Sequence, residues 1–152
     1  MKKFIITLFF KQNKHHKHSV LIHTLKVFWF SLYSGRTKFC TAALLHDIGK
    51  PFVAIKDEDD YGYSFTNHEE KSYQIIKNWP FISEYTKNVV RYHYLIRRIE
   101  KDSEKLKRGK KASNGDLITK EGVDEMIKTY SNFSREFKID LKIFQKLDDK
   151  AK

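Results

Sequence analysis

Hydrophobic side chains occupy almost every side of one predicted helix, residues 18–32. A helix that is apolar all round belongs in the interior of a protein, so we expect this one to be central and buried. Ser34 and Gly35 end it, because glycine readily adopts the left-handed conformation that closes a helix. The short apolar segment near the chain start, residues 4–10, is expected to pack into the core as well.

A second apolar run, residues 42–45, leads directly into His46 and Asp47. The turn at 49–51 contains a glycine and a proline, which do not continue a helix. The pattern therefore predicts a helix end that carries an imidazole and a carboxylate into the interior. An ionised carboxylate is costly to bury unless a cation meets it, and Lys50 is near enough in sequence to point a positive charge at the same place.

The middle of the chain predicts two more helices. Residues 66–69 have the spacing of a capping box, and Pro80 closes the helix that begins there. Ser83 can cap the next helix, which we expect to run to about Arg98. Residues 51–65 show no clear period, and we expect a loop that lies over the helix ends.

The C-terminal third is more polar. Residues 100–120 are strongly charged and include the run KLKRGKK, which predicts an exposed basic loop or helix extension. Two further helices are expected around 122–133 and 138–151. No alternating strand pattern of useful length is present. The prediction is an all-α helical bundle that forms a single domain over residues 1–152.

Charge narrows the classes of partner. Lys and Arg total 30 against 19 Asp and Glu, a formal net charge of +11. This excess favours polyanionic partners, with nucleic acid ahead of an anionic membrane, although a solvated basic surface would have the same composition. No obligate protein partner is evident.

Two features of the sequence indicate a cytoplasmic setting. The single cysteine, Cys40, has no partner for an intramolecular disulfide, which is typical of a reducing compartment. The start of the chain, MKKFIITLFF, resembles a signal peptide only briefly, and no small-residue cleavage site follows. No segment approaches the roughly 20 apolar residues of a membrane span, so we expect no membrane association.

Four histidines are expected to face the interior from four separate helices. Singly, a buried histidine is more often a hydrogen-bonded core residue than a metal ligand. Several imidazoles in one core are costly unless something satisfies them together, and a divalent cation does so. Nitrogen and oxygen ligands suit Mn, Fe, Co, Ni or Zn better than Ca. The candidate ligands are His23, His46, His68 and His93, together with the carboxylate of Asp47.

Four motifs follow one another along the chain: HTLKV at 23–27, LLHDIGKP at 44–51, NHEEKSYQII at 67–76 and VVRYHYLI at 89–96. In this order and spacing they resemble the HD superfamily of metal-dependent phosphohydrolases. The likeness covers residues 18–152, and it is nearest to the HD domains attached to bacterial CCA-adding tRNA nucleotidyltransferases and to small stand-alone or phage-encoded relatives.

This resemblance implies a site for one or two divalent metal ions, with Mg also possible. His23, His46, Asp47 and a late aspartate would hold one ion. Asp47 would bridge to a second ion held by His68 and His93.

Two ligand positions stay open. His18 also heads an apolar stripe and competes with His23, although the HTLKV match favours His23. The late aspartate is Asp140, Asp148 or Asp149. Burial on the last helix favours Asp140, which could instead cap the helix start. The resemblance favours Asp148, because LDDKAK looks like the closing A-D-x-x-A-Q segment of related domains.

The chemistry expected from these residues is hydrolysis of a phosphate ester by metal-activated water. Asp47 and Lys50 are the expected catalytic residues. Lys50, Arg97 and Arg98 are candidate phosphate contacts, although the two arginines could equally be solvated charges at a helix end. Lys71 and Arg91 are weaker candidates.

The resemblance suggests nucleotides, cyclic phosphates or phosphorylated nucleic-acid ends as substrates, and the positive charge favours nucleotides or nucleic acid. One alternative is a non-catalytic nucleic-acid-binding module that uses residues 101–111. Another is a regulatory domain that binds a nucleotide without turnover.

Overall fold

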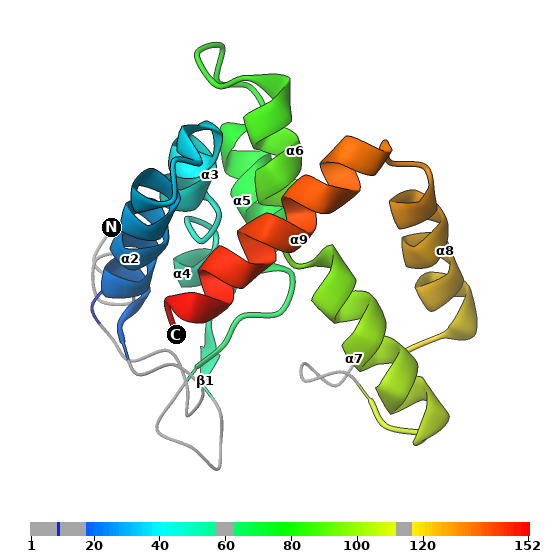
Figure 1. Cartoon of the computed structure of the whole chain (residues 1–152). Coiled ribbons are helices and arrows are strands. Elements are labelled where there is room, and N and C mark those ends of the chain that lie inside the picture. The colour runs from blue at the N-terminus through cyan, green and yellow to red at the C-terminus, as the bar shows by residue number, and fades with distance from the viewer. Residues whose placement is uncertain (1–8, 10–17, 57–62, 112–116) are drawn as a thin grey trace.

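The structure, a computed structural model, describes residue 9 and residues 18–56, 63–111 and 117–152. Its helices and strands within these ranges are all helices except one small antiparallel pair, β1 (Ile55–Lys56) with β2 (Tyr63–Ser64). The pair falls inside the segment predicted to be a loop. The all-α prediction is confirmed. Figure 1 shows α2, α3, α5 and α6 gathered on one side, α7 and α8 on the other, and α9 crossing between them.

Helix α2 (Val20–Tyr33) begins at Ser19, whose hydroxyl accepts a hydrogen bond from the amide of Ile22. It ends at Ser34, and Gly35 follows with φ of 68°, as the sequence predicted. The prediction of burial on all sides is wrong. One face packs on α3 and α9, whereas Trp29 on the opposite face is 53 % exposed, because α2 lies at the edge of the bundle.

The apolar run forms α3 (Cys40–Leu45), preceded by a short 3-10 turn, Thr37–Phe39. The chain then turns through His46 and Asp47 into a short helix, α4 (Lys50–Val53). Pro51 therefore does not stop a helix. It lies in the first turn of α4, where a missing amide hydrogen costs nothing.

Helix α5 (His68–Ile76) does not begin with the predicted capping box. Its N-cap is Asn67, in the left-handed conformation with φ of 63°, and Asn67 makes no side-chain cap. Glu69 bonds Arg98 on α7 instead of a backbone amide of its own turn. The tertiary ion pair has thus replaced the local cap.

Ser83 caps α6 (Glu84–Tyr92) as predicted, through the amide of Thr86. The single helix expected to reach about Arg98 is two helices, because the chain turns after α6 and α7 (Leu95–Lys107) begins. His93 lies at this break, where its ring bonds the carbonyl oxygen of Val90. The basic segment is a helix extension as far as residue 107, and residues 112–116 lie outside the described ranges.

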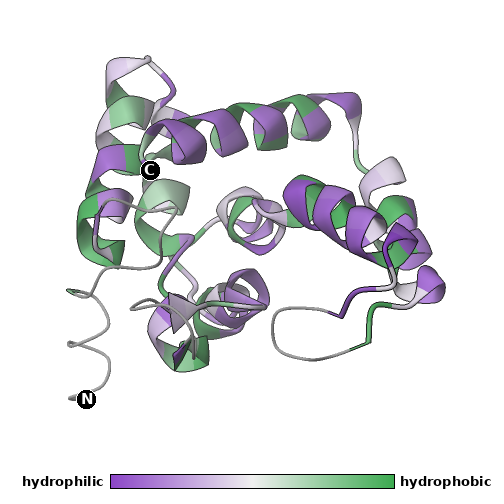
Figure 2. Ribbon diagram, turned by 90° about the horizontal axis from the view of Figure 1, so that it is seen from below, coloured by the Kyte–Doolittle hydropathy of each residue, from purple (hydrophilic) through white to green (hydrophobic). Residues whose placement is uncertain are grey.

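The last two helices are α8 (Lys120–Ser131) and α9 (Arg135–Lys150), close to their predicted positions. α8 packs on α7, and α9 packs on α2. Hydrophilic residues are the more frequent kind along α7 and α9, and apolar residues lie between them (Figure 2). The core gathers side chains from α2, the 3-10 turn, α3, α5, α6, α9 and the residue that follows α9: Val27, Phe39, Ala42, Ala43, Ile76, Val89, Val90, Phe144, Leu147 and Ala151.

The segment 4–10, expected to pack in the core, lies outside the described residues except for Phe9, which is exposed. Among the described residues, no helix has the length and apolar character needed to cross a membrane.

Candidate metal centre

Six buried side chains from distant parts of the chain meet at one place in the described structure. α2, α5 and α9 each contribute one, the turn after α3 contributes two, and the end of α6 contributes one. They are His23, His46, Asp47, His68, His93 and Asp148, and each is 7 % exposed or less.

Three of the histidines are oriented in the same way. The Nδ1 atoms of His46, His68 and His93 each lie 2.8 Å from the backbone carbonyl oxygen three residues earlier. A carbonyl oxygen only accepts, so Nδ1 carries the hydrogen, and in the neutral ring Nε2 presents a lone pair. The local helix geometry therefore directs the Nε2 atoms away from their own backbone and toward the shared cluster.

One group of atoms is formed by His23, His46 and the two aspartates. His23 Nε2 lies 2.8 Å from Asp148 Oδ1 and 3.6 Å from Asp47 Oδ2. His46 Nε2 lies 3.2 Å from Asp47 Oδ2 and 3.6 Å from Asp148 Oδ1. Donor atoms of His23, His46 and Asp47 fall within 4.8 Å of one another, close enough to share one cation.

A second group uses the other oxygen of Asp47. Its Oδ1 lies 3.4 Å from His68 Nε2, and His68 Nε2 lies 3.3 Å from His93 Nε2. Donor atoms of these three residues also fall within 4.8 Å of one another. The two oxygens of Asp47 therefore face two adjacent groups of nitrogen atoms, which is the arrangement of a bridging carboxylate.

Two of these buried atoms are poorly satisfied: Asp47 Oδ1 has no hydrogen-bond partner among the described residues, and His46 Nε2 has only its ion-pair contacts with Asp47 and Asp148. A buried polar atom without a partner costs about 1–3 kcal/mol. A divalent cation in each group would satisfy both atoms with nitrogen and carboxylate ligands of a type that transition metals and zinc accept. The residues present therefore fit the predicted metal ions.

The pKa values of most groups in the cluster favour the protonation states that can bind a cation. Burial, and then the positive charge of His46, lower the pKa of His93 to about 3. Burial also lowers the pKa of His68 to about 4. Burial alone would raise the pKa values of Asp47 and Asp148, but the neighbouring histidines, and Lys50 in the case of Asp47, hold both well below the usual range. At neutral pH these four groups are already in the protonation state that binds metal.

His46 is the exception. Burial lowers its pKa, but the charges of Asp47 and Asp148 outweigh burial and raise it to about 9. In the absence of a metal, the His46 ring is therefore protonated at neutral pH, and its Nε2 must lose a proton before it can ligate.

Lys50 lies where the sequence predicted. It is buried, and its Nζ donates to Asp47 Oδ2 at 2.6 Å. Arg97 borders the cluster, because its Nη1 lies 3.6 Å from Asp148 Oδ2 while Nη2 bonds Asp149. Arg98 lies farther along α7 and donates to Asn67 and Glu69.

The two weaker phosphate candidates are engaged elsewhere. Arg91 donates to Glu70 at 2.9 Å, and Lys71 lies over the ring of Phe52.

The structure separates the alternatives that the sequence left open. His18 accepts a hydrogen bond from Lys26 and is not part of the cluster, whereas His23 is. Asp140 is buried but bonds Lys38 and Tyr85, at 2.6 and 2.7 Å. It does not cap α9, whose N-cap is Ser134.

Asp149 is more exposed and bonds Arg97 and Lys152. Asp148 alone of the three aspartates faces the histidines.

Sequence reasoning missed Ser72, which fastens the turn after α3 to α5. Its hydroxyl accepts from the amide of Gly49 at 2.9 Å and donates to the carbonyl oxygen of His46 at 2.7 Å. The available signal was its position four residues after His68, on the same face of a helix. Ser72 thus holds the turn with His46 and Asp47 in register with α5 through backbone atoms, without touching the side chains of the cluster.

Comparison with protein families agrees with this geometry. The family model described as HD domain matches residues 20–130, most of the chain. The chain therefore belongs to the HD superfamily of metal-dependent phosphohydrolases, whose helical domains bind divalent metals. No curated protein and no solved structure matches the chain.

The family match contains His23, His46, Asp47, His68 and His93 but ends before α9. The family comparison therefore does not bear on Asp148, and its position beside His23 comes from the structure alone.

Proposed function

We propose that this protein is a metal-dependent phosphohydrolase that cleaves phosphate esters of nucleotides or of nucleic-acid ends. The observation that carries the proposal is the placement of Asp47. Its two oxygens face two groups of histidine nitrogens, and each group has room for one cation. Family membership supports hydrolysis as the reaction class.

In this proposal His23, His46, Asp47 and Asp148 hold one ion, and Asp47, His68 and His93 hold a second. Bound there, the ions would supply an activated water at neutral pH and offset charge on the phosphoryl oxygens.

Lys50 orients Asp47 through its 2.6 Å contact and places a positive charge beside the reacting phosphate. Arg97 lies at the edge of the cluster, where its guanidinium can turn from Asp149 toward a phosphate oxygen.

The net charge of +11 supports a polyanionic substrate, since a basic surface attracts nucleotides and nucleic acid over a Debye length of about 8 Å at physiological ionic strength. The reaction needs only the substrate, water and the metal, so no partner protein is required.

The test begins with removal of bound metal by a chelator and reloading with Mn, Fe, Co, Ni, Zn or Mg in turn. Each preparation is assayed for phosphate release from nucleoside mono-, tri- and cyclic phosphates and from short oligonucleotides. Asp47→Ala should lose metal and turnover together, and Asp149→Ala, the exposed neighbour of a predicted ligand, should keep its metal.

Wild-type metal content and turnover in Asp47→Ala would refute the proposal. Full metal loading with nucleotide binding, but without turnover on any substrate, would favour the non-catalytic binding module instead.

A further inference from the structure

The two carboxylate oxygens of Glu69, the residue that follows His68, have different surroundings. Oε1 accepts a hydrogen bond from Arg98 Nη1 at 3.1 Å. Oε2 is buried, lies 3.3 Å from Nδ1 of His68, and has no hydrogen-bond partner among the described residues. A buried, charged acceptor without a full hydrogen bond is costly, so the fold accepts a cost to place a carboxylate behind this ring.

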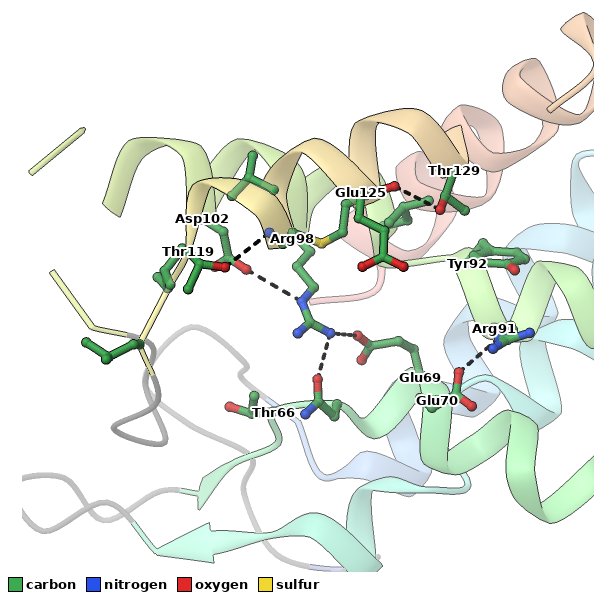
Figure 3. A pocket seen from close by; sticks show the side chains of 17 residues that line it. Thr66, Glu69, Glu70, Arg91, Tyr92, Arg98, Asp102, Thr119, Glu125 and Thr129 are labelled. Atoms are coloured by element: carbon green, nitrogen blue, oxygen red, sulfur yellow. Dashed lines mark hydrogen bonds and ion pairs between the residues drawn. The ribbon is translucent and has the colours of Figure 1, made fainter. Parts of the chain in front are cut away.

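Contacts from α7 hold Glu69 in this position. Arg98 Nη1 also donates to Asn67 Oδ1 at 2.6 Å, and Arg98 Nε lies 3.5 Å from Asp102 Oδ2. Figure 3 shows Arg98 between Glu69 and Asp102, at the wall of a cavity of about 480 Å³. Asn67 is the N-cap of α5 and, within the described ranges, the only residue other than glycine with a positive φ. Arg98 therefore fixes both the start of α5 and the carboxylate two residues later.

The ring of His68 has a second tautomer that competes with metal binding. Its Nε2 lies 3.3 Å from His93 Nε2 and 3.4 Å from Asp47 Oδ1, and both of these atoms can accept a hydrogen. A hydrogen on Nε2 of His68 would satisfy one of them, but it would occupy the lone pair that a metal ion needs. In the metal-free protein, the ligating tautomer therefore depends on what surrounds Nδ1, on the other side of the ring.

Two oxygen atoms lie beside Nδ1 of His68. The carbonyl oxygen of Phe65 is 2.8 Å away, and Oε2 of Glu69 is 3.3 Å away. A hydrogen on Nδ1 faces two acceptors, whereas a lone pair on Nδ1 would face two negative oxygens and be repelled by both. Among the described residues, Nδ1 of His46 and of His93 each has a carbonyl oxygen but no carboxylate beside it. His68 is thus the one ring of these three whose tautomer is also set by a charge.

We propose that Glu69 is a positioning residue of the second group: its Oε2 keeps the ring hydrogen of His68 on Nδ1, so that Nε2 presents a lone pair to the ion. Arg98 acts through Glu69, which it holds by the other oxygen. The proposal concerns the place of one hydrogen in a neutral ring and not the loss of that hydrogen. It rests on the proposed function, because His68 is a ligand of the same metal centre.

The first test locates the hydrogen in the metal-free full chain. At pH 7.5 the His68 ring is neutral, since its pKa is lowered to about 4. Long-range ¹H–¹⁵N correlation NMR then distinguishes the protonated ring nitrogen from the bare one, and His68→Gln identifies the signals of this ring. Nδ1 should carry the hydrogen in the wild-type protein. A hydrogen on Nε2 of wild-type His68 would overturn the proposal.

Glu69→Gln should reverse the preference. Arg98 donates to Oε1, so it will hold the amide oxygen of glutamine on its own side and leave the NH₂ group where Oε2 stood. A donor then opposes the hydrogen on Nδ1, and the tautomer with hydrogen on Nε2 should become populated in His68 but not in His93. An unchanged tautomer of His68 in Glu69→Gln would show that the carbonyl oxygen of Phe65 suffices, and it would refute the role of Glu69.

Metal affinity separates this role from a purely structural one. Calorimetric titration should give about 10- to 100-fold weaker metal binding in Glu69→Gln. Glu69→Met, which removes the carboxylate without adding a donor, should lose less. If Glu69 only anchored Arg98, the order would be the reverse, because glutamine keeps an acceptor for Arg98 and methionine does not. Equal losses, or a larger loss in Glu69→Met, would therefore contradict the proposal.

Two controls complete the experiment. Glu70→Gln makes the same chemical change one residue along α5, where Glu70 bonds Arg91, and it should keep the wild-type tautomer and metal affinity. Thermal unfolding checks that each variant folds; if Glu69→Met does not, the tautomer in Glu69→Gln decides alone. Because the tautomer is measured without metal or substrate, a wild-type protein that hydrolyses no phosphate ester would refute the proposed function and leave this result unaffected.

Discussion

Gly49 has too little space around it for any larger residue. A Cβ atom at this position would lie 2.5 Å from the carbonyl oxygen of His68 and 2.6 Å from the amide nitrogen of Ser72. Both are backbone atoms of α5, which cannot rotate away as a flexible side chain could. Ordinary contact begins at 3.4 Å, so Gly49→Ala must separate the turn from α5 by about 0.9 Å (3.4 − 2.5).

This displacement acts directly on the proposed bridge. The turn carries His46 and Asp47, whereas α5 carries His68, and Asp47 Oδ1 lies only 3.4 Å from His68 Nε2. It also strains the two hydrogen bonds of Ser72. From the usual cost of overpacking we expect a loss of about 1–3 kcal/mol, or about 2–12 °C in Tm. From the effect of disturbed supporting contacts we expect metal affinity to fall about 10- to 100-fold.

The assay combines thermal unfolding of the metal-free protein with titration of metal into the folded variant. Gly122→Ala is the matched control, because Gly122 lies in α8 and its added Cβ would meet only the Thr119 hydroxyl, at 3.2 Å. The gain in helix propensity of about 1 kcal/mol is offset by a weaker cap, because the Thr119 hydroxyl also accepts from the Gly122 amide, so we expect only a small change in Tm and no change in metal affinity. Wild-type Tm and metal affinity in Gly49→Ala would refute the argument that this contact holds the two ligand groups together.

Three other predictions follow from the same structure. Asp148→Ala should lose metal, measured per chain, whereas Asp140→Ala should keep it, and the reverse result would overturn the choice of late ligand. Because the pKa of His46 is raised to about 9, metal binding at pH 7.5 should release about one proton, and affinity should rise about tenfold per pH unit until it levels off near pH 9. Calorimetry in buffers of different ionisation enthalpy measures this release, and its absence would contradict ligation by His46. Neutralising the basic residues of 105–111 should make the slope of log affinity for an oligonucleotide against log salt concentration shallower by about 0.7–0.9 for each phosphate that the segment neutralises. Turnover of a small phosphodiester should stay unchanged. An unaltered slope would mean that the segment contributes to solubility and not to binding.

The sequence predicted most of the side chains that meet in the cluster, because they occur on apolar helix faces. His23 follows the apolar stripe of α2, and His93 lies among Val89 and Val90. Such spacing determines which way a side chain faces. The order of the motifs then indicated the family resemblance. The same rule could not choose among the late aspartates, since Asp140 and Asp148 are both buried, at 9 % and 7 % exposed. The two aspartates differ in their hydrogen-bond partners, and these partners lie far away in sequence.

The errors have a common physical origin. Residues 66–69 satisfy the local rule for a capping box, yet Glu69 bonds Arg98, which is 29 residues away. Helix periodicity continues through His93, yet the chain turns there and directs α7 away from α6. In both cases a tertiary contact or a change of direction near the candidate site overrides a sound local preference.

The facing rings of His68 and His93 give the strongest physical reason for a cation at this place. Their Nε2 atoms are 3.3 Å apart, and each Nδ1 hydrogen is already donated to a backbone carbonyl oxygen. A switch of tautomer would bring a hydrogen between the rings only by giving up one of those bonds. Protonation is opposed as well, because the pKa values are lowered to about 4 and about 3. Two lone pairs held together without a proton, on the Oδ1 side of the ionised Asp47, form a place that favours a positive ion.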